Sequence, residues 1–297
     1  MALAVPTSYV RPRTLSEALG ALADAPRLVL AGGTDVYPAH VTTPIDRPVL
    51  DISRVEGLRG IDLGRDGSWR LGATTTWTEV AETDALPAAF DGLRQAARQV
   101  GGRQIQNTGT VAGNIVNASP AADGTPNLLA LDAIVECASA ARGVRRVALE
   151  SFLTGYRSTD LAPDELVTAL VVPPVDDTSR SAFAKLGSRA SLVIAIASVA
   201  AVLDVRDGSV VEARIVVGAC SPVPLRLRGL EEELVARRGE PGMDAGAGPK
   251  PGARLAAAVE ARHLAELSPI DDVRAPAAYR THAALTLVRR AIREVGA

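Results

Sequence analysis

Thiol and metal-binding chemistry is almost absent from this 297-residue sequence. It contains only two cysteines, Cys137 and Cys220, whereas an iron–sulfur cluster is held by about four thiolates. The chain therefore cannot hold such a cluster alone, and a disulfide framework is excluded, although a single bridge is not. The histidines His40, His263 and His282 are scattered, and neither an HExxH nor a CxxC spacing occurs, so the sequence predicts no metal site.

A surplus of charge and a long apolar segment are also missing. Lysines and arginines number 32 against 34 aspartates and glutamates, a formal net charge of -2. This balance argues against a nucleic-acid binder, which usually carries a basic surplus. The longest nearly pure apolar run, residues 192–203, is shorter than the roughly 18–20 residues of a membrane helix. The N-terminus, broken by Pro6 and Pro12, is unlike a signal peptide, so we expect a cytoplasmic protein without a membrane span.

The composition is that of a folded chain with small aliphatic side chains in its core. Hydrophobic residues make up 47% and aromatic residues only 3%, and the length suits two domains of about 100–200 residues each. Thr14 and Glu17 form the pattern of a capping box at the start of a helix. Strand-like segments alternate with helical ones after it, so the expected fold class is α/β (α+β).

Several segments have a clear local preference. Strands are predicted at 27–31, 49–52, 69–75, 133–138, 144–149, 165–172, 182–186 and 210–218, and helices at 88–100, 253–264 and 276–295. Residues 75–85 suit a helix or a turn. The run at 192–203 suits a buried helix or a strand, and its β-branched residues favour the strand. Asp207 and Gly208 predict a hairpin turn.

Glycine, proline and polar residues mark the predicted connections. Residues 101–127 are predicted to be a loop, and residues 239–252, of which eight are glycine or proline, a mobile surface loop. Pro173 and Pro174, followed by acidic residues, predict a domain boundary near residue 176.

The first candidate binding segment spans residues 29–36. Its members are Val29, Leu30, Ala31, Gly32, Gly33, Thr34, Asp35 and Val36. Because the two glycines have no side chains, successive backbone N–H groups can converge there on an anion, and Thr34 adds a hydroxyl donor. The alternative is an ordinary tight turn. Neither a GxGxxG nor a GK[ST] motif is present, so this is no Rossmann fingerprint or P-loop.

The second candidate segment spans residues 107–123. It is too polar and glycine-rich for a core element, yet Val111, Ile115 and Val116 interrupt it too often for a linker. Such a segment suits a loop that wraps an extended ligand with ribose and phosphate groups. The alternative is an ordered loop whose own asparagine and serine side chains satisfy it. Together the two segments predict a two-sided clamp for a dinucleotide.

These segments carry a resemblance to a known family. The sequences AGGTD and TGTVAGNIVNASPAADGTPNLLALDA closely resemble the flavin-binding subunits of molybdenum hydroxylases, the xanthine dehydrogenase and carbon monoxide dehydrogenase group. The resemblance continues through FLTGYRST at 152–159, FAKLGSR at 183–189 and VGACSP at 217–222. It covers essentially the whole chain and is weakest after Arg238.

The resemblance implies a fold and a cofactor. The fold would be a two-lobed FAD-binding domain of the PCMH type at 1–176, with lobes of about 1–57 and 58–176. A C-terminal domain of the CO dehydrogenase flavoprotein type, with an antiparallel sheet and helices, would follow at 177–297. FAD would be held noncovalently in the cleft between these parts.

The resemblance also implies roles for individual residues. Residues 29–36 would grip the pyrophosphate, and Asp123 would hydrogen-bond the cofactor. The second phosphate and the ribityl chain would be held by Thr110, Val111, Ala112, Gly113 and Asn114. Val100 and Val167 match apolar positions near the flavin or the adenine. Lys185 matches a basic residue at the isoalloxazine edge, where an ammonium favours the anionic reduced flavin.

The implied function is electron transfer through the cofactor, without a catalytic side chain. Electrons from a molybdopterin-binding large subunit would pass through the [2Fe–2S] clusters of a small subunit to FAD, and on to NAD or another acceptor. Many relatives carry an acid where this chain has Val193, and together with residues 218–222 this departure favours the xanthine dehydrogenase branch. The alternatives are a medium subunit of a carbon monoxide dehydrogenase-like or an aldehyde- or heterocycle-oxidising enzyme, a non-redox nucleotide-binding module, and a scaffold whose glycines only form turns.

Overall fold

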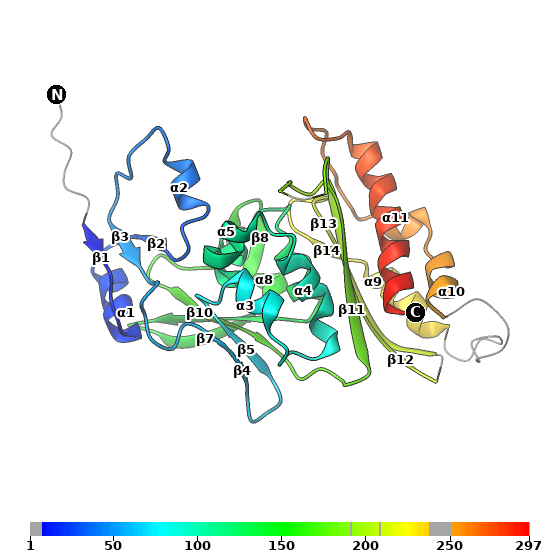
Figure 1. Cartoon of the computed structure of the whole chain (residues 1–297), viewed down its shortest axis with the longest axis horizontal. Helices are drawn as coiled ribbons and strands as arrows, with labels where there is room; N and C mark the ends of the chain where they lie inside the picture. Colours follow the sequence, from blue (N-terminus) through cyan, green and yellow to red (C-terminus); the bar gives the residue numbers. More distant parts are fainter. Residues whose placement is uncertain (1–7, 191, 208, 238–250, 297) are drawn as a thin grey trace.

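Three β-sheets follow one another along the long axis of the molecule (Figure 1). The structure is a computed structural model that describes residues 8–190, 192–207, 209–237 and 251–296. Helices fill the space between the second and third sheets and cover the outer face of the third (Figure 1). No helix in these ranges is long and apolar enough to cross a membrane.

The first sheet is small and parallel. Its strand order is β1-β3-β2, with β1 at Tyr9–Val10, β3 at Val49–Asp51 and β2 at Leu28–Leu30. Helix α1 (Leu15–Asp24) begins with the predicted capping box, in which Thr14 Oγ1 accepts from Glu17 N–H and the Glu17 carboxylate accepts from Thr14 N–H. Its buried face, Ala18 and Leu22, belongs to a core shared with Leu50.

The second sheet is antiparallel. Its strand order is β4-β5-β10-β6-β7, with β4 at Ile61–Leu63, β5 at Trp69–Gly72, β10 at Leu166–Val172, β6 at Ile134–Ser139 and β7 at Gly143–Ala148. The central strand β10 is buried along its whole length. A short helix α8 (Leu149–Phe152) and the hairpin of β8 (Leu153–Gly155) and β9 (Ser158–Thr159) follow β7.

Short helices, not a loop, occupy most of residues 101–127. The helices of this segment are α5 (Arg103–Thr108), α6 (Val111–Asn117) and α7 (Gly124–Ala130). Earlier in the chain come the short helices α2 (Val36–Ala39), α3 (Trp77–Glu82), η1 (Ala88–Phe90) and α4 (Asp91–Ala97). The loop prediction was wrong because each of α5, α6 and α7 is only six or seven residues long, too short to show a repeating stripe. In α6 the buried residues are Val111, Ala112 and Ile115, and their spacing places them on one face.

The third sheet separates two cores. Its antiparallel order is β11-β12-β13-β14, with β11 at Ser179–Leu186, β12 at Ala197–Arg206, β13 at Ser209–Gly218 and β14 at Leu225–Arg226. On β12, Ala200 and Val202 face the central core, while Val199 and Ala201 face the C-terminal core. Burial on both faces of the sheet explains the continuous apolar run. Of the two structures that the sequence allowed for this run, a buried helix or a strand, the strand is the one observed.

One strand prediction on this part of the chain needs correction, and two other predictions fall wholly or partly outside the described residues. The strand predicted at 192–203 begins only at Ala197, because Leu192 has a left-handed φ of 53° and belongs to the connection after β11. Gly208 of the predicted hairpin turn and residues 239–250 of the predicted mobile loop lie outside the described residues. Pro251 and Gly252, also assigned to that loop, begin helix α10.

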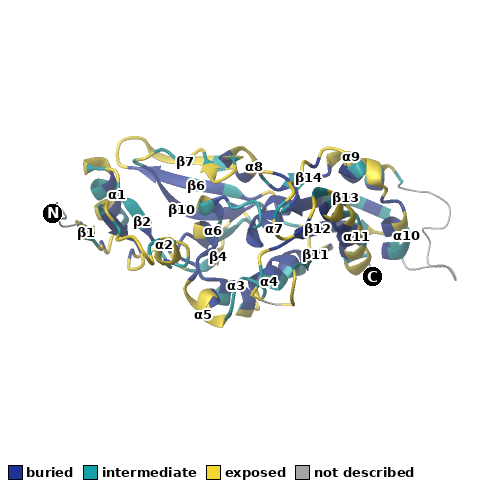
Figure 2. Ribbon diagram, turned by 90° about the horizontal axis from the view of Figure 1, so that it is seen from above, coloured by how far each residue is buried: buried dark blue, intermediate teal, exposed yellow. Residues whose placement is uncertain are grey.

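The C-terminal helices cover the outer face of the third sheet. They are α9 (Arg228–Ala236), α10 (Pro251–Ala257), η2 (Ala261–Leu264) and α11 (Ala277–Val295). Figure 2 shows the third sheet buried between α11 on one side and α4 and α7 on the other. The sheet therefore forms a wall that both cores share, and its edge strand β11 carries Lys185.

Candidate functional site

The two predicted binding segments, about eighty residues apart in sequence, lie directly against each other. A methyl carbon at Gly32 would lie 2.5 Å from the carbonyl carbon of Thr108 and 3.1 Å from Gly109 Cα. The Thr34 hydroxyl lies over Gly109, whose carbonyl accepts from Trp77 N–H at 3.2 Å. The absence of side chains at Gly32 and Gly109 therefore allows the two backbones to approach each other closely.

The turn after β2 presents free backbone donors. Gly33 has a left-handed φ of 70°, and a side chain there would meet the Tyr37 ring at 2.6 Å. Within the described ranges, the N–H groups of Gly32, Gly33 and Thr34 donate to no backbone or side-chain acceptor. Successive free N–H groups around a left-handed glycine suit an anion such as a diphosphate.

Residues 110–114 are a helix start and not the predicted loop. Thr110 Oγ1 accepts from Gly113 N–H at 3.1 Å, and Val111 N–H donates to Thr75 O at 2.9 Å. Asn114 N–H donates to Thr110 O. Because these donors are already used, this segment has less free backbone to offer an anion than residues 32–34 have.

Lys185 and Asp123 form a buried ion pair that the sequence did not predict. Lys185 Nζ lies 2.5 Å from Asp123 Oδ2, and the two side chains are only 5% and 9% exposed. Asp123 precedes α7, whereas Lys185 lies on β11. Burial raises the pKa of Asp123 to about 6, although the Lys185 charge acts to lower it. The Lys185 ammonium is thus charge-balanced by Asp123.

Several buried oxygens without a protein partner belong to the segments that carry this pair or pack against it. In the described part of the chain they include Asn114 Oδ1, Asp123 Oδ1, Thr125 Oγ1 and Ser198 Oγ. Ser198 is the β-sheet partner of Lys185, and the Asn114 amide contacts Gly124. Buried polar atoms nearly always have a hydrogen-bond partner, so this group of oxygens suits a polar ligand. Hydroxyl and ring N–H groups, as in the ribityl chain and flavin ring of FAD, match these acceptors.

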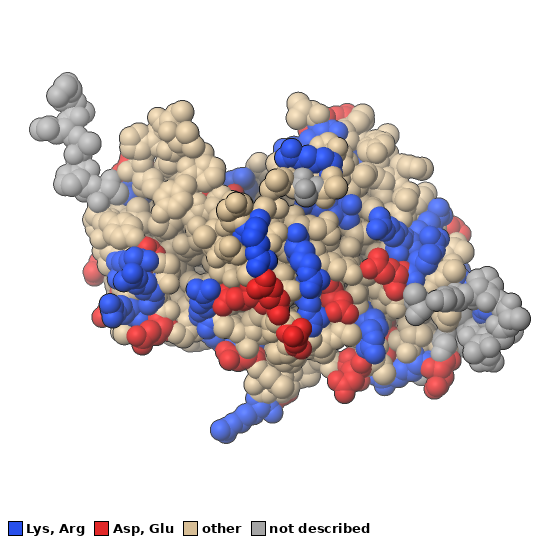
Figure 3. Space-filling view, viewed as in Figure 1, with Lys and Arg blue, Asp and Glu red and all other residues tan. Residues whose placement is uncertain are grey.

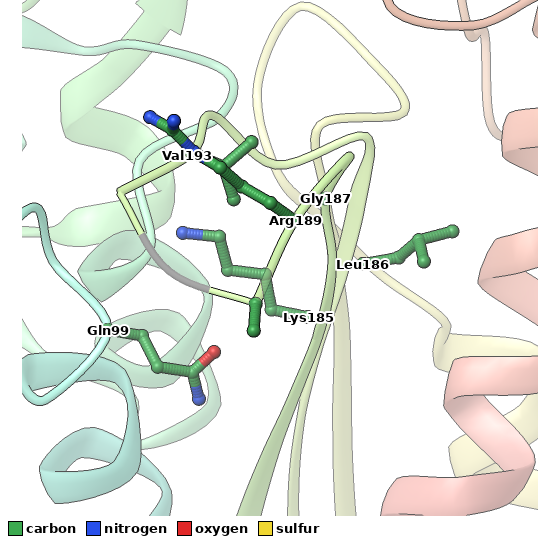
Figure 4. Close-up of a pocket in the computed structure, with 7 residues that line it drawn as sticks. Gln99, Lys185, Leu186, Gly187, Arg189 and Val193 are labelled. Carbon is green, nitrogen blue, oxygen red and sulfur yellow. The ribbon is translucent and has the colours of Figure 1, made fainter.

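A cavity of about 260 Å³ opens beside Lys185 (Figure 4). It is lined by Gln99, Lys185, Leu186, Gly187, Arg189, Ala190 and Val193. In Figure 4 the Lys185 side chain points between Gln99 and Val193, while Leu186 points away toward the C-terminal helices. Figure 3 shows the surface hollowed between the protrusion that carries α2 and this end of the third sheet.

Six of the seven residues that line this cavity were not among the predicted site residues, which included only Lys185. Arg189 ends the segment FAKLGSR that carries the family resemblance and Val193 follows it by four residues, so the K-x-x-x-R spacing was the available signal. Gln99 precedes the predicted Val100 but had no motif to mark it. A side chain at Gly187 would lie 3.1 Å from Val193 Cγ2, so the valine closes tightly onto the cavity wall.

Some predicted site residues have side chains that point into cores. Val29 and Ala31 pack against the core of the first sheet, and Leu30 is buried. Val111 and Ala112 belong to the central core, as does Val167, which is 3% exposed and does not line the cavity. Val100 packs against the same core beside the cavity residue Gln99. Asp35 and Val36 begin α2 at the rim of the turn.

Comparisons with known proteins agree with this architecture. The profile of the FAD-binding domain in molybdopterin dehydrogenases matches residues 5–175, and that of the CO dehydrogenase flavoprotein C-terminal domain matches residues 181–295. The xanthine dehydrogenase FAD-binding subunit of Escherichia coli O157:H7 is 36% identical over 228 residues, covering 76% of this chain and 78% of that one. The nicotinate dehydrogenase FAD-subunit of Eubacterium barkeri is 34% identical over 236 residues, covering 76% and 79%.

A solved structure shows the same arrangement over the whole chain. The carbon monoxide dehydrogenase from Hydrogenophaga pseudoflava superposes with a TM-score of 0.85 at 25% identity, covering 99% of this chain and 98% of that one. The fold and the profiles define an FAD-binding flavoprotein. The chain belongs to the FAD-binding medium subunits of the molybdenum hydroxylase family, of the xanthine and carbon monoxide dehydrogenase type, and is an oxidoreductase subunit. The predicted family, fold class and FAD are confirmed.

Proposed function

We propose that this chain is the FAD-carrying electron-transfer subunit of a xanthine dehydrogenase-like molybdenum hydroxylase. The observation that carries the proposal is the meeting of two side-chain-poor backbone segments next to a buried ion pair with unused oxygens. Bound FAD supplies two-electron redox chemistry. The residues of this chain bind it, exclude water from it and set the local charge.

The proposed binding roles follow the chemistry of each position. Backbone N–H groups of residues 32–34 hold the diphosphate, with Thr34 adding a hydroxyl donor. Asn114 and Asp123 offer buried acceptors to the polar part of the cofactor, and Lys185 supplies the nearby cation. Val29, Leu30, Ala31, Asp35, Val36, Thr110, Val111, Ala112 and Gly113 shape these segments, and Val100 and Val167 add apolar support.

The proposed assembly follows from what the chain contains. With two cysteines, both buried and free, it needs a [2Fe–2S] small subunit and a molybdopterin-binding large subunit as partners. We propose that electrons enter from the small subunit and leave to NAD. We also propose a domain division at residue 176, with lobes of about 1–57 and 58–176. Separate sheets on either side of residue 176 and the family matches at 5–175 and 181–295 support the division.

The xanthine dehydrogenase branch is supported by similarity and by one position. A xanthine dehydrogenase subunit and a nicotinate dehydrogenase subunit share 36% and 34% identity with this chain. Val193, where many relatives carry an acid, lines the cavity beside Lys185. A carbon monoxide dehydrogenase-like enzyme remains the second candidate, because the whole-chain superposition with a TM-score of 0.85 favours it.

The test is reconstitution of the purified full chain with FAD. We expect the yellow absorbance band of bound flavin, weakened in Gly33→Val and unchanged in the control Gly229→Ala, where a methyl group meets no atom within 4 Å. A chain that gains no band would refute the flavin function and favour the scaffold. NADH should bleach the band, and a band that NADH leaves intact would overturn NAD as the acceptor. Co-expression with candidate large and small subunits should yield one complex on gel filtration.

A further inference from the structure

Lysine is rare in this chain. Of the 32 lysines and arginines, only Lys185 and Lys250 are lysines. Elsewhere the described chain uses arginine, both for surface charges and for ion pairs with buried carboxylates, such as Arg226 with Glu231 and Arg145 with Glu165. Because arginine is used at almost every other basic position, the lysine at this buried position indicates that a guanidinium would not replace the ammonium at residue 185.

The geometry of the pair shows what an ammonium does differently. Lys185 Nζ donates to Asp123 Oδ2 and leaves Asp123 Oδ1, buried, without a partner in the described part of the chain. By contrast, the Arg145 guanidinium engages both carboxylate oxygens of Glu165, at 2.7 and 2.8 Å. Arginine forks normally take a carboxylate in this two-point way, whereas lysine acts as a point charge. Lysine at 185 therefore keeps Asp123 Oδ1 clear of protein donors, and the lone pairs of this oxygen can accept a hydrogen bond from the cofactor and also take a proton.

The surroundings of Asp123 make its free oxygen a site for a proton. Burial disfavours its charged form and raises its pKa to about 6, and Lys185 is the charged group that counteracts this effect. Elements packed around the pair contribute neutral groups, namely Asn114 from α6, Thr125 from α7, Ser198 from β12 and Gln99 after α4. Arg189, which lines the cavity, donates to the backbone carbonyl of Leu192. Among the described residues, Lys185 is the one cation that forms an ion pair with Asp123.

We propose that Asp123 takes up a proton at Oδ1 each time the bound flavin is reduced, and releases it on reoxidation. This inference rests on the proposed function. Two electrons from the [2Fe–2S] partner and one proton reach the flavin, which becomes a monoanion, and a second proton from solvent neutralises Asp123. The pair thereby changes from neutral to a single positive charge, which balances the negative charge added to the site.

The test is the pH dependence of the flavin reduction potential in the FAD-loaded full chain. Each proton taken up with two electrons changes the equilibrium constant tenfold per pH unit, or about 30 mV. Over the two pH units above the Asp123 pKa of about 6, two protons give a slope of about 60 mV per unit. We expect about half that slope in Asp123→Asn and in Lys185→Arg, whose fork occupies Oδ1. The control Glu231→Gln, a buried acid of the C-terminal core, should keep the full slope.

A second measurement needs no variant to fold. The reduced-minus-oxidised infrared difference spectrum of the wild-type chain should contain a protonated-carboxyl band. A wild-type slope of about 30 mV per pH unit, a missing carboxyl band, or an undiminished slope in Asp123→Asn would each overturn the proposal. These outcomes are distinct from failure of the proposed function, in which the chain binds no FAD and no potential can be measured.

Discussion

The contact between the two glycine segments gives the sharpest prediction. In Gly32→Ala the new methyl carbon would lie 2.5 Å from the Thr108 carbonyl carbon, well inside van der Waals contact. The Thr108 carbonyl oxygen would lie closer still, so the two segments must separate by roughly 1.5 Å, and overpacking of this kind typically costs about 1–3 kcal/mol. Because the free chain can open while FAD needs both segments closed, we expect this energy to appear mainly in binding, as a loss of about 5- to 150-fold in FAD affinity.

The assay is FAD binding by fluorescence quenching, with circular dichroism to verify folding. Gly20→Ala is the matched control, because a methyl group at this position in α1 meets no atom within 4 Å. At this half-buried helix position the change should add about 0.5–1 kcal/mol of stability, and the Gly20→Ala variant should bind FAD normally. Wild-type FAD affinity in a folded Gly32→Ala variant would refute the argument that close backbone approach builds the site.

Three further predictions concern buried groups away from the glycine segments. The bidentate Arg145 guanidinium lowers the pKa of Glu165 from 4.5 to about 2, so this carboxylate stabilises the folded state above its unfolded pKa and the stabilisation is lost as pH falls toward 2. Glu165→Gln should flatten thermal stability in that acid range and lower it at neutral pH by about 1–3 kcal/mol; an unchanged acid profile would contradict this. Burial raises the pKa values of Cys137 and Cys220 to about 11, so iodoacetamide should label neither thiol until the chain is unfolded. Mass spectrometry measures the labelling, and modification of either cysteine in the folded chain would contradict this expectation. The Arg280 side chain is 3% exposed and donates to the Ile196 carbonyl at 2.7 Å. Arg280→Met should lower the unfolding free energy measured in urea by about 3–5 kcal/mol. A near-neutral effect would show that this buried guanidinium is dispensable for stability.

Local signals predicted the fold where they were complete within a few residues. The Thr14 and Glu17 pattern identified α1, because a capping box needs only the four residues that make it. The glycine segments were identified for the same reason, since an absent side chain is visible in the sequence. The short helices were missed because a helix of six or seven residues gives too little periodicity to distinguish it from a polar loop.

Tertiary pairing was beyond reach from one sequence. Lys185 and Asp123 are 62 residues apart, and either residue alone suits an exposed, solvated side chain. Both side chains become buried only when β11 packs against the segment before α7. Each charge then needs the other as its partner. The strand identity of β12 likewise depended on a second core, because apolar residues on both faces have no period that separates strand from helix.

The wall that the third sheet forms between two cores limits how the molecule can move. Swinging the C-terminal helices off the third sheet would expose Val199 and Ala201 on one face of β12. Swinging this sheet away from the central core would expose Ala200 and Val202 on the other face. Cofactor entry and exit must therefore use the edges of the molecule, where the turn after β2 and the connection after β11 meet solvent. Such a frame would keep a bound flavin in a fixed position relative to both cores.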